Sequence, residues 1–257
     1  MKKGFILFAS CLMASAAAFA QMTCVVAHRG YWDIEGSAQN SIRALVKADS
    51  IGAYGSEFDV WMTADKKLVV NHDPDINGVH IETSKAKEVL AQKLRNGENV
   101  PTLEQYLDRS LTLKPRLILE LKSHKDKKHE EEAVIAIVKM IKERNLEANV
   151  EYITFSKEAF VNFIKYAPKG TPVFYLNGEL TPREIKAMGG AGIDYHYNVL
   201  KKNPWWIAEC HALNLRVNAW TVNKAADMKW CIDHGVDIIT TNAPELLQKM
   251  LLEKWWR

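Results

Sequence analysis

Short apolar runs alternate with longer amphipathic segments from residue 24 to the end of the chain. The periodicity is clearest in residues 129–145, where Val134, Ile137, Val138 and Ile141 recur at the spacing of one helix face. Glu130–Glu132 stand near the start of this segment and Lys142 and Arg144 near its end, which complements the dipole of a helix. The pattern therefore predicts a helix that packs one face against a core.

The short apolar runs have the length and composition of buried strands. Strands are predicted over residues 24–28, 56–62, 117–122, 150–155, 172–176, 193–197, 216–221 and 236–241. Helices are predicted near 40–53, 102–109, 129–145, 157–166, 181–188, 204–214, 224–234 and 244–254, several of them opened by proline or a capping residue.

Eight strand–helix repeats without an all-β block predict a parallel sheet that closes on itself, and the fold class is therefore α/β, a (β/α)8 TIM barrel. An additional short strand is expected at 68–72, after a turn at 65–67. Residues 74–100 contain only a weak helix at 84–94 and are expected to form a small inserted flap at the barrel mouth. The alternative is an open doubly wound sheet, which typically has a Gly-rich loop after its first strand. This chain has His28-Arg29-Gly30 there, which does not match the G-x-G-x-x-G pattern.

The first twenty residues predict a cleaved signal peptide and hence export to the periplasm or the exterior. Lys2-Lys3 precede an apolar run that closes with Ala18-Phe19-Ala20 before Gln21. Residues 21–257 then form a single catalytic domain. Lipid anchoring at Cys11 is the less favoured alternative, because Phe8 stands where such sites prefer a small aliphatic residue.

Composition excludes some functions and leaves others open. The chain has 257 residues, 25% charged and 47% hydrophobic, with a formal net charge of +3 that falls to near +1 without Lys2 and Lys3. No long basic run predicts nucleic-acid binding, no segment beyond the leader is apolar enough to span a membrane, and no protein partner is implied. Cys24, Cys210 and Cys231 remain after cleavage; they are interpreted as buried apolar residues, although a bond between the last two stays open.

Polar side chains gather where the predicted strands end, which is where barrel enzymes place their working residues. Glu57 and Asp59 alternate with apolar neighbours and so face the same side of their strand. Two carboxylates that point together into a barrel repel each other unless positive charge holds them. The neighbouring strand ends add the remaining polar groups: His28, Arg29, His72, Glu120 and Lys122.

These residues predict a site for one divalent cation and an anionic substrate. Glu57, Asp59 and Glu120 offer oxygen ligands only, which favours Ca²⁺ or Mg²⁺ over zinc. Arg29 and Lys122 would bind the other oxygens of a phosphate group. His28 and His72 could then serve as general base and acid. The alternative, that the carboxylates form structural ion pairs with Arg29 and Lys122, requires no metal.

The same residues resemble the motifs of the glycerophosphodiester phosphodiesterase family, and the matches follow one another along most of the mature chain. The chain departs from the family pattern at Ala38-Gln39-Asn40-Ser41, where Pro-Glu-Asn-Thr is usual, and at Asn242, where aspartate is common. The matching segments are His28-Arg29-Gly30, Glu57-Phe58-Asp59-Val60 with His72-Asp73, Val100–Glu104, Glu120-Leu121-Lys122, Val217–Asn223 and Gly235–Thr241.

The resemblance implies hydrolysis of small glycerophosphodiesters to glycerol 3-phosphate and an alcohol on a metal-containing TIM barrel. It assigns the metal to Glu57, Asp59 and Glu120 and acid–base catalysis to His28 and His72. It also assigns phosphate contacts to Arg29 and Lys122, and the aromatic wall beside the glycerol moiety to Trp220. Two alternatives stay open: a barrel phosphodiesterase that acts on intact phospholipid, and a secreted protein that binds a phosphorylated ligand without turnover.

Overall fold

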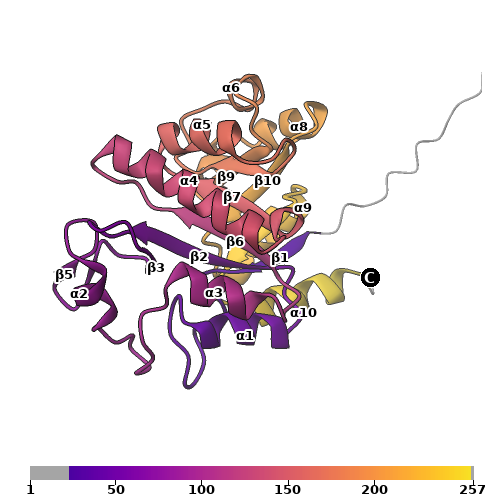
Figure 1. Ribbon diagram of the computed structural model, residues 1–257. Coiled ribbons are helices and arrows are strands. Elements are labelled where there is room, and N and C mark those ends of the chain that lie inside the picture. The colour runs from indigo at the N-terminus through magenta and orange to yellow at the C-terminus, as the bar shows by residue number, and fades with distance from the viewer. Residues whose placement is uncertain (1–22, 256–257) are drawn as a thin grey trace, which may run out of the picture.

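Eight parallel strands close into a barrel in the computed structural model, which describes residues 23–255 (Figure 1). β1 pairs with β11 on one side and with β2 on the other, so the sheet has no free edge between them. The predicted (β/α)8 barrel is confirmed. The barrel strands are β1 (Cys24–Ala27), β2 (Gly55–Met62), β6 (Arg116–Leu121), β7 (Val150–Thr154), β8 (Val173–Tyr175), β9 (Gly192–His196), β10 (Arg216–Trp220) and β11 (Ile238–Thr241).

The seam between β1 and β2 is short. Two registered residue pairs join these strands, Val26 with Gly55 and Ala27 with Ser56, whereas six pairs join β2 to β6. At this seam Gly55 leaves room for neighbouring side chains, because a Cβ there would lie 3.1 Å from the side chain of Ile118 and 3.2 Å from that of Val26.

Helices surround the barrel, and the predicted ones are all present with small shifts at their ends. The longest, α4, begins earlier than predicted because the Asp126 side chain accepts hydrogen bonds from the backbone N–H groups of Lys128 and His129. The helices are α1 (Ile42–Ser50), α3 (Leu103–Ser110), α4 (Lys127–Glu143), α5 (Lys157–Tyr166), α6 (Pro182–Ala187), α8 (Trp205–Ala212), α9 (Ala225–Asp233) and α10 (Pro244–Trp255), with a 3₁₀ turn at Glu147–Asn149.

One helix was not predicted. α7 (Tyr197–Lys202) begins directly at the end of β9, and its first turn is capped by the His196 side chain, which accepts from the Asn198 N–H. Histidine is outside the usual group of capping residues, so the sequence carried no recognisable start signal at this position.

The insertion after β2 lies at the end of the barrel toward which β2 points, at the left in Figure 1. It contains β3 (Leu68–Val70), antiparallel to β2, the small hairpin β4 (Asp75–Ile76) and β5 (Val79–His80), and the short helix α2 (Ala86–Leu90). Its apolar side chains form a separate cluster: Ile76, Ile81, Val89, Leu94 and Val100 pack with Trp61 and Val69. The flap therefore has a small core of its own, beside the carboxyl ends of the strands.

Two expectations concern regions away from the barrel mouth. No helix among residues 23–255 is at once long enough and apolar enough to cross a bilayer. Cys210 and Cys231 are both buried and are not bonded to each other. The predicted signal peptide and the alternative lipid anchor fall on residues 1–20, outside the described residues.

Candidate active site

A tight turn follows β1 and fixes His28, Arg29 and Gly30. Arg29 and Gly30 both have positive φ values, 58° and 75°. Glycine is required at position 30, since a Cβ there would lie 2.6 Å from the Cβ of Ala44. Arg29 has a Cβ, so its left-handed backbone conformation is strained, as is often found at functional sites. The turn directs the Arg29 N–H at a carboxylate oxygen of Glu57, at 2.6 Å.

Three carboxylates meet at the carboxyl ends of β2 and β6. Glu57 and Asp59 share one face of β2, as the alternation of the strand predicted, and Asp59 stands in register with Glu120 on β6. One oxygen from each of the three lies within 4.8 Å of the others, and all three side chains are buried. The structure thus brings together the three residues predicted as metal ligands.

Two basic side chains contact this cluster but do not balance it. The Lys122 ammonium lies 2.7 Å from Glu120 Oε1 and 3.3 Å from Asp59 Oδ1, and Arg29 Nε lies 3.8 Å from Asp59 Oδ2. Two positive charges therefore face three carboxylates. The alternative of structural ion pairs alone leaves one carboxylate without a matching charge.

The pKa values of the carboxyl groups reflect this shortage of positive charge. Burial, followed by the charges of Asp59 and Glu120, raises the pKa of Glu57 well above its usual range. Burial and Asp59 raise the pKa of Glu120 to about 7. Burial acts on Asp59 in the same direction, but Lys122, His72 and Arg29 outweigh it and lower the pKa of that group. The cluster is stable in its ionised form only with further positive charge.

A divalent cation fits this arrangement. Glu57 Oε1 is buried and makes no hydrogen bond within the described chain, so it is available as a ligand. The three groups supply oxygen atoms only, which is the donor set that Ca²⁺ and Mg²⁺ prefer. The structure is therefore compatible with the predicted cation, and the donor set alone does not choose between these two ions.

Both predicted histidines line the same cavity as Glu57 and Glu120. His28 Nδ1 lies 2.7 Å from Asn242 Oδ1, and because that oxygen also accepts from Trp32 Nε1, it is the acceptor in both contacts. His28 thus carries its hydrogen on Nδ1 and keeps a free lone pair on Nε2. Burial and the charge of Arg29 lower the pKa of His28 to about 4. His72 is more exposed, and its Nδ1 lies 2.7 Å from the carboxylate of Asp73.

Opposite the charged groups, the cavity wall is apolar and aromatic. Trp220 lines it together with Ile153, Phe155 and Leu176. The indole N–H of Trp220 donates to the backbone carbonyl of Asp194 at 2.8 Å, and its ring makes an edge contact with Phe155. The tryptophan is therefore fixed in orientation, with a wall suited to carbon–hydrogen groups of a ligand.

The structure adds three residues to which the sequence assigned no role. Asn40 holds Asp59 from both sides: its Nδ2 donates to Asp59 Oδ2 at 2.8 Å, and its Oδ1 accepts the Asp59 N–H at 3.0 Å. Asn242, a departure from the family pattern, still supplies the oxygen that orients His28. Asp194 is buried at the cavity floor with one oxygen unpartnered in the described chain. The alternation of its strand signalled an inward position for Asp194, whereas nothing local signalled the two asparagines.

Gln39, the other departure, also contacts the site. Its Oε1 accepts a hydrogen bond from Arg29 Nη1. The usual glutamate would place a negative charge on the guanidinium, while the neutral amide orients Arg29 and leaves its charge unpaired on that side. The substitution therefore preserves a positioning contact without adding a fourth carboxylate.

Comparisons with known proteins agree with this geometry. The model of the glycerophosphoryl diester phosphodiesterase family matches residues 28–246. A glycerophosphodiester phosphodiesterase of Bacillus subtilis is 30% identical over 257 aligned residues, covering 88% of this chain and 85% of the relative.

Solved structures show the same similarity in three dimensions. A glycerophosphodiester phosphodiesterase of Parabacteroides distasonis shares 50% identity and superposes with a TM-score of 0.90, over 91% of this chain and 99% of that one. An Oleispira antarctica phosphodiesterase, 20% identical over 90% of this chain and 97% of its own, shares the fold with a TM-score of 0.76. On the extent of these matches, this chain is an enzyme that belongs to the glycerophosphoryl diester phosphodiesterase family.

Proposed function

We propose that this enzyme hydrolyses small glycerophosphodiesters to glycerol 3-phosphate and an alcohol, with one bound Ca²⁺ or Mg²⁺. The observation that carries the proposal is the buried cluster of Glu57, Asp59 and Glu120, which has an unpartnered oxygen and too little positive charge of its own. The Oleispira antarctica relative has been solved in complex with its product sn-glycerol-3-phosphate, which supports the same product here.

Glu57, Asp59 and Glu120 would hold the cation, which when bound supplies positive charge to the phosphoryl oxygens. Arg29 and Lys122 lie beside the cluster and bind the remaining oxygens of the phosphate. Arg29 also lines the cavity, so its guanidinium is placed to contact the substrate. The arrangement stabilises negative charge that develops on the phosphoryl group.

The two histidines carry the proton transfers. His28 keeps a free lone pair on Nε2, because Asn242 fixes its hydrogen on Nδ1, and it therefore serves as the base that takes a proton from the attacking water. Burial lowers the pKa of His72 overall, while Asp59 and the contact with Asp73 act in the opposite direction. We assign His72, the second histidine of the cavity, as the acid that protonates the leaving alkoxide. Trp220 packs against the carbon atoms of the glycerol moiety.

The proposal is tested by measuring release of glycerol 3-phosphate from a glycerophosphodiester, with and without chelator. We expect activity to disappear with chelator and to return with Ca²⁺ or Mg²⁺. His28→Ala and His72→Ala should each lower kcat by about 10²- to 10⁴-fold, the usual contribution of general acid–base catalysis. His234→Ala is the matched control, since this exposed histidine at the end of α9 contacts the carbonyl and the ring of Trp230 and does not line the cavity.

Several outcomes would contradict the proposal. Full activity in chelator would exclude the metal, and unchanged rates in both alanine variants would exclude the acid–base roles. Faster turnover of diacyl phospholipid than of its deacylated form would favour the alternative substrate class. Binding of glycerol 3-phosphate without any turnover of diesters would favour a binding protein.

A further inference from the structure

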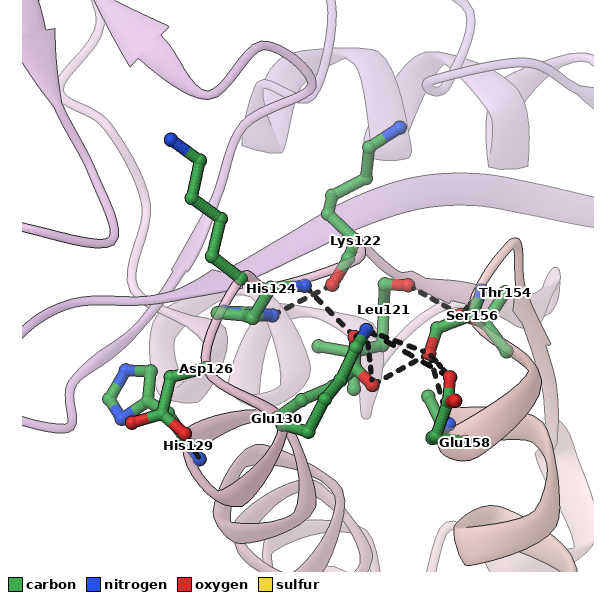
Figure 2. Close-up of polar contacts among 12 residues, drawn as sticks. Leu121, Lys122, His124, Asp126, His129, Glu130, Thr154, Ser156 and Glu158 are labelled. Atoms are coloured by element: carbon green, nitrogen blue, oxygen red, sulfur yellow. Dashed lines mark hydrogen bonds and ion pairs between the residues drawn. The ribbon is translucent and has the colours of Figure 1, made fainter.

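His124 follows the end of β6 and is buried, although the residues around it in the sequence are polar. Its neighbours in sequence are lysines, glutamates and an aspartate, a composition typical of a solvent-exposed segment. In the structure His124 is 2% exposed and lies between the carboxyl ends of β2 and β6. Figure 2 shows it below Lys122, whose side chain leads away from the imidazole.

Both ring nitrogens of His124 are occupied, and together they define one tautomer. Nε2 lies 3.0 Å from the backbone N of Met62, a group that can only donate, so Nε2 is the acceptor. Nδ1 must then carry the hydrogen, and it donates to the backbone carbonyl of Lys122 at 2.8 Å (Figure 2). The imidazole is thus a neutral bridge from the end of β2 to the end of β6.

The backbone around His124 is itself held by buried side chains. The His124 N–H donates to Glu130 Oε1 at 2.9 Å, and Glu130 is fully buried on α4 (Figure 2). Glu130 Oε2 accepts from Ser156 at 2.6 Å, and Thr154 donates to the carbonyl of Leu121 at 2.9 Å. The end of β6 and the residues that follow it are therefore held by hydrogen bonds from α4 and β7.

A second contact connects His124 to the predicted acid. Its ring makes an edge contact with the indole of Trp61, at 5.1 Å between centroids. Trp61 Nε1 in turn donates to the backbone carbonyl of His72 at 3.2 Å. His124 therefore contacts the backbone of Lys122 directly and that of His72 through Trp61, and it does not line the cavity.

We propose that His124 is a positioning residue for Lys122, and that its Nδ1–H bond to the Lys122 carbonyl is the contact that matters. This bond fixes the backbone from which the Lys122 ammonium reaches Asp59 and Glu120. The inference rests on the proposed phosphate-binding role of Lys122. A loss of this bond would tilt the lysine away from the phosphate and weaken substrate binding.

Two substitutions separate the two hydrogen bonds of the ring. In His124→Asn the side-chain amide can donate from near the position of Nδ1, which preserves the bond to Lys122. In His124→Gln the longer side chain places its amide near Nε2, which preserves the bond to Met62 instead. Each variant loses one hydrogen bond and part of the ring packing, so each is a matched control for the other in stability.

We expect H124N to keep kcat/KM within about threefold of the wild type. H124Q, which loses the hydrogen bond to the Lys122 carbonyl, should lose about tenfold, or about 1.4 kcal/mol, mainly through KM. The affinity for glycerol 3-phosphate should fall in parallel, while urea midpoints of the two variants stay similar. Equal losses of activity, or losses that follow the urea midpoints, would overturn the proposal.

Lys122→Met distinguishes a failure of this inference from a failure of the proposed function. If K122M binds glycerol 3-phosphate normally, the role of Lys122 is wrong; if K122M is impaired while H124Q is not, only the inference about His124 is wrong. Should the His124 variants fail to fold, nitrogen NMR of the wild-type imidazoles still tests the bridge. The His124 ring should show hydrogen on Nδ1, and hydrogen on Nε2 would refute it.

Discussion

Both ends of the barrel interior bury carboxylates, but they neutralise them differently. At the amino-terminal end, Glu151 on β7 accepts from Arg116 Nε at 2.9 Å, from Arg216 Nη1 at 3.1 Å and from the Tyr54 hydroxyl at 3.1 Å. At the carboxyl-terminal end, Glu57 and Glu120 are about as buried, yet Glu57 Oε1 has no partner in the described chain.

The difference separates a structural ion pair from a binding site. The chain supplies all the charge that Glu151 needs, so this end is complete without any ligand. At the other end the carboxylates outnumber the basic groups, and the missing charge has to come from outside the chain. Burial alone is therefore a poor indicator of function in this barrel, whereas an unbalanced buried charge is a good one.

The largest expected effect is a loss of activity from a substitution at the carboxyl-terminal end of the barrel. Glu57→Gln removes one charge from the unbalanced cluster and one predicted metal ligand. We expect kcat/KM to fall by about 10³-fold or more, in the range of losses seen when electrostatic stabilisation of a transition state is removed. In chelator the free energy of unfolding should rise by about 1–2 kcal/mol, because repulsion among buried carboxylates is relieved. Diester hydrolysis and urea denaturation measure both.

If Glu57→Gln were less stable than the wild type in chelator, this account would be contradicted. Such a result would mean that groups of the chain itself stabilise the ionised carboxylate of Glu57. Retention of full activity would remove Glu57 from the metal site.

The opposite result is expected at the other end. Glu151→Gln leaves Arg116 and Arg216 facing each other without their carboxylate, and breaking a buried ion pair in this way costs about 3–5 kcal/mol. The unfolding free energy should fall by that order, while kcat/KM at a temperature where the variant is folded stays within about threefold. Urea denaturation and the same hydrolysis assay test the two halves of this prediction.

If folded Glu151→Gln lost as much kcat/KM as Glu57→Gln, both ends of the barrel would affect catalysis. The contrast between a structural end and a binding end would then be wrong. Glu151→Asp serves as the control, since it keeps the charge and shortens only the reach.

The smallest effect concerns acid, and it also belongs to the carboxyl-terminal end. Burial lowers the pKa of His124. The unfolded chain therefore takes up a proton first, near pH 6.5, and the contribution of His124 to stability is lost as the pH falls below that value. Between pH 7.5 and pH 5.5 the wild type should lose about 1 kcal/mol more than H124N, which cannot titrate at this position. Urea midpoints at the two pH values measure the difference.

Parallel pH profiles of the wild type and H124N would show that His124 does not contribute. Because the carboxyl groups are the same in both proteins, their own titration cancels in this comparison.

The sequence predicted the barrel well because its signals are local and repeated. The alternation in Glu57-Phe58-Asp59 fixes which side chains enter the interior, and the register of β2 with β6 then follows from closure of the barrel. The acidic cluster and its basic neighbours therefore followed from strand positions alone.

The remaining parts of the site depend on loop geometry that no periodic pattern records. Asn40 reaches Asp59 because its own backbone has a positive φ of 62° and is held by the carbonyl of Arg29. His124 is buried by the return of α4 over the strand ends, against the polar character of its neighbours in sequence. Such side chains are determined by contacts between segments far apart in the chain, and a reading of local composition misplaces them.

The short seam between β1 and β2 has a consequence for how the enzyme assembles. Beyond its two registered pairs, the seam is continued by the Gly30 N–H bonded to the Glu57 carbonyl at 3.0 Å and by the Arg29 N–H bonded to the Glu57 carboxylate. The turn that carries His28 and Arg29 thus also supplies hydrogen bonds that close the barrel between β1 and β2. Closure of the sheet between β1 and β2 therefore also brings His28 and Arg29 beside the carboxylates of β2 and β6.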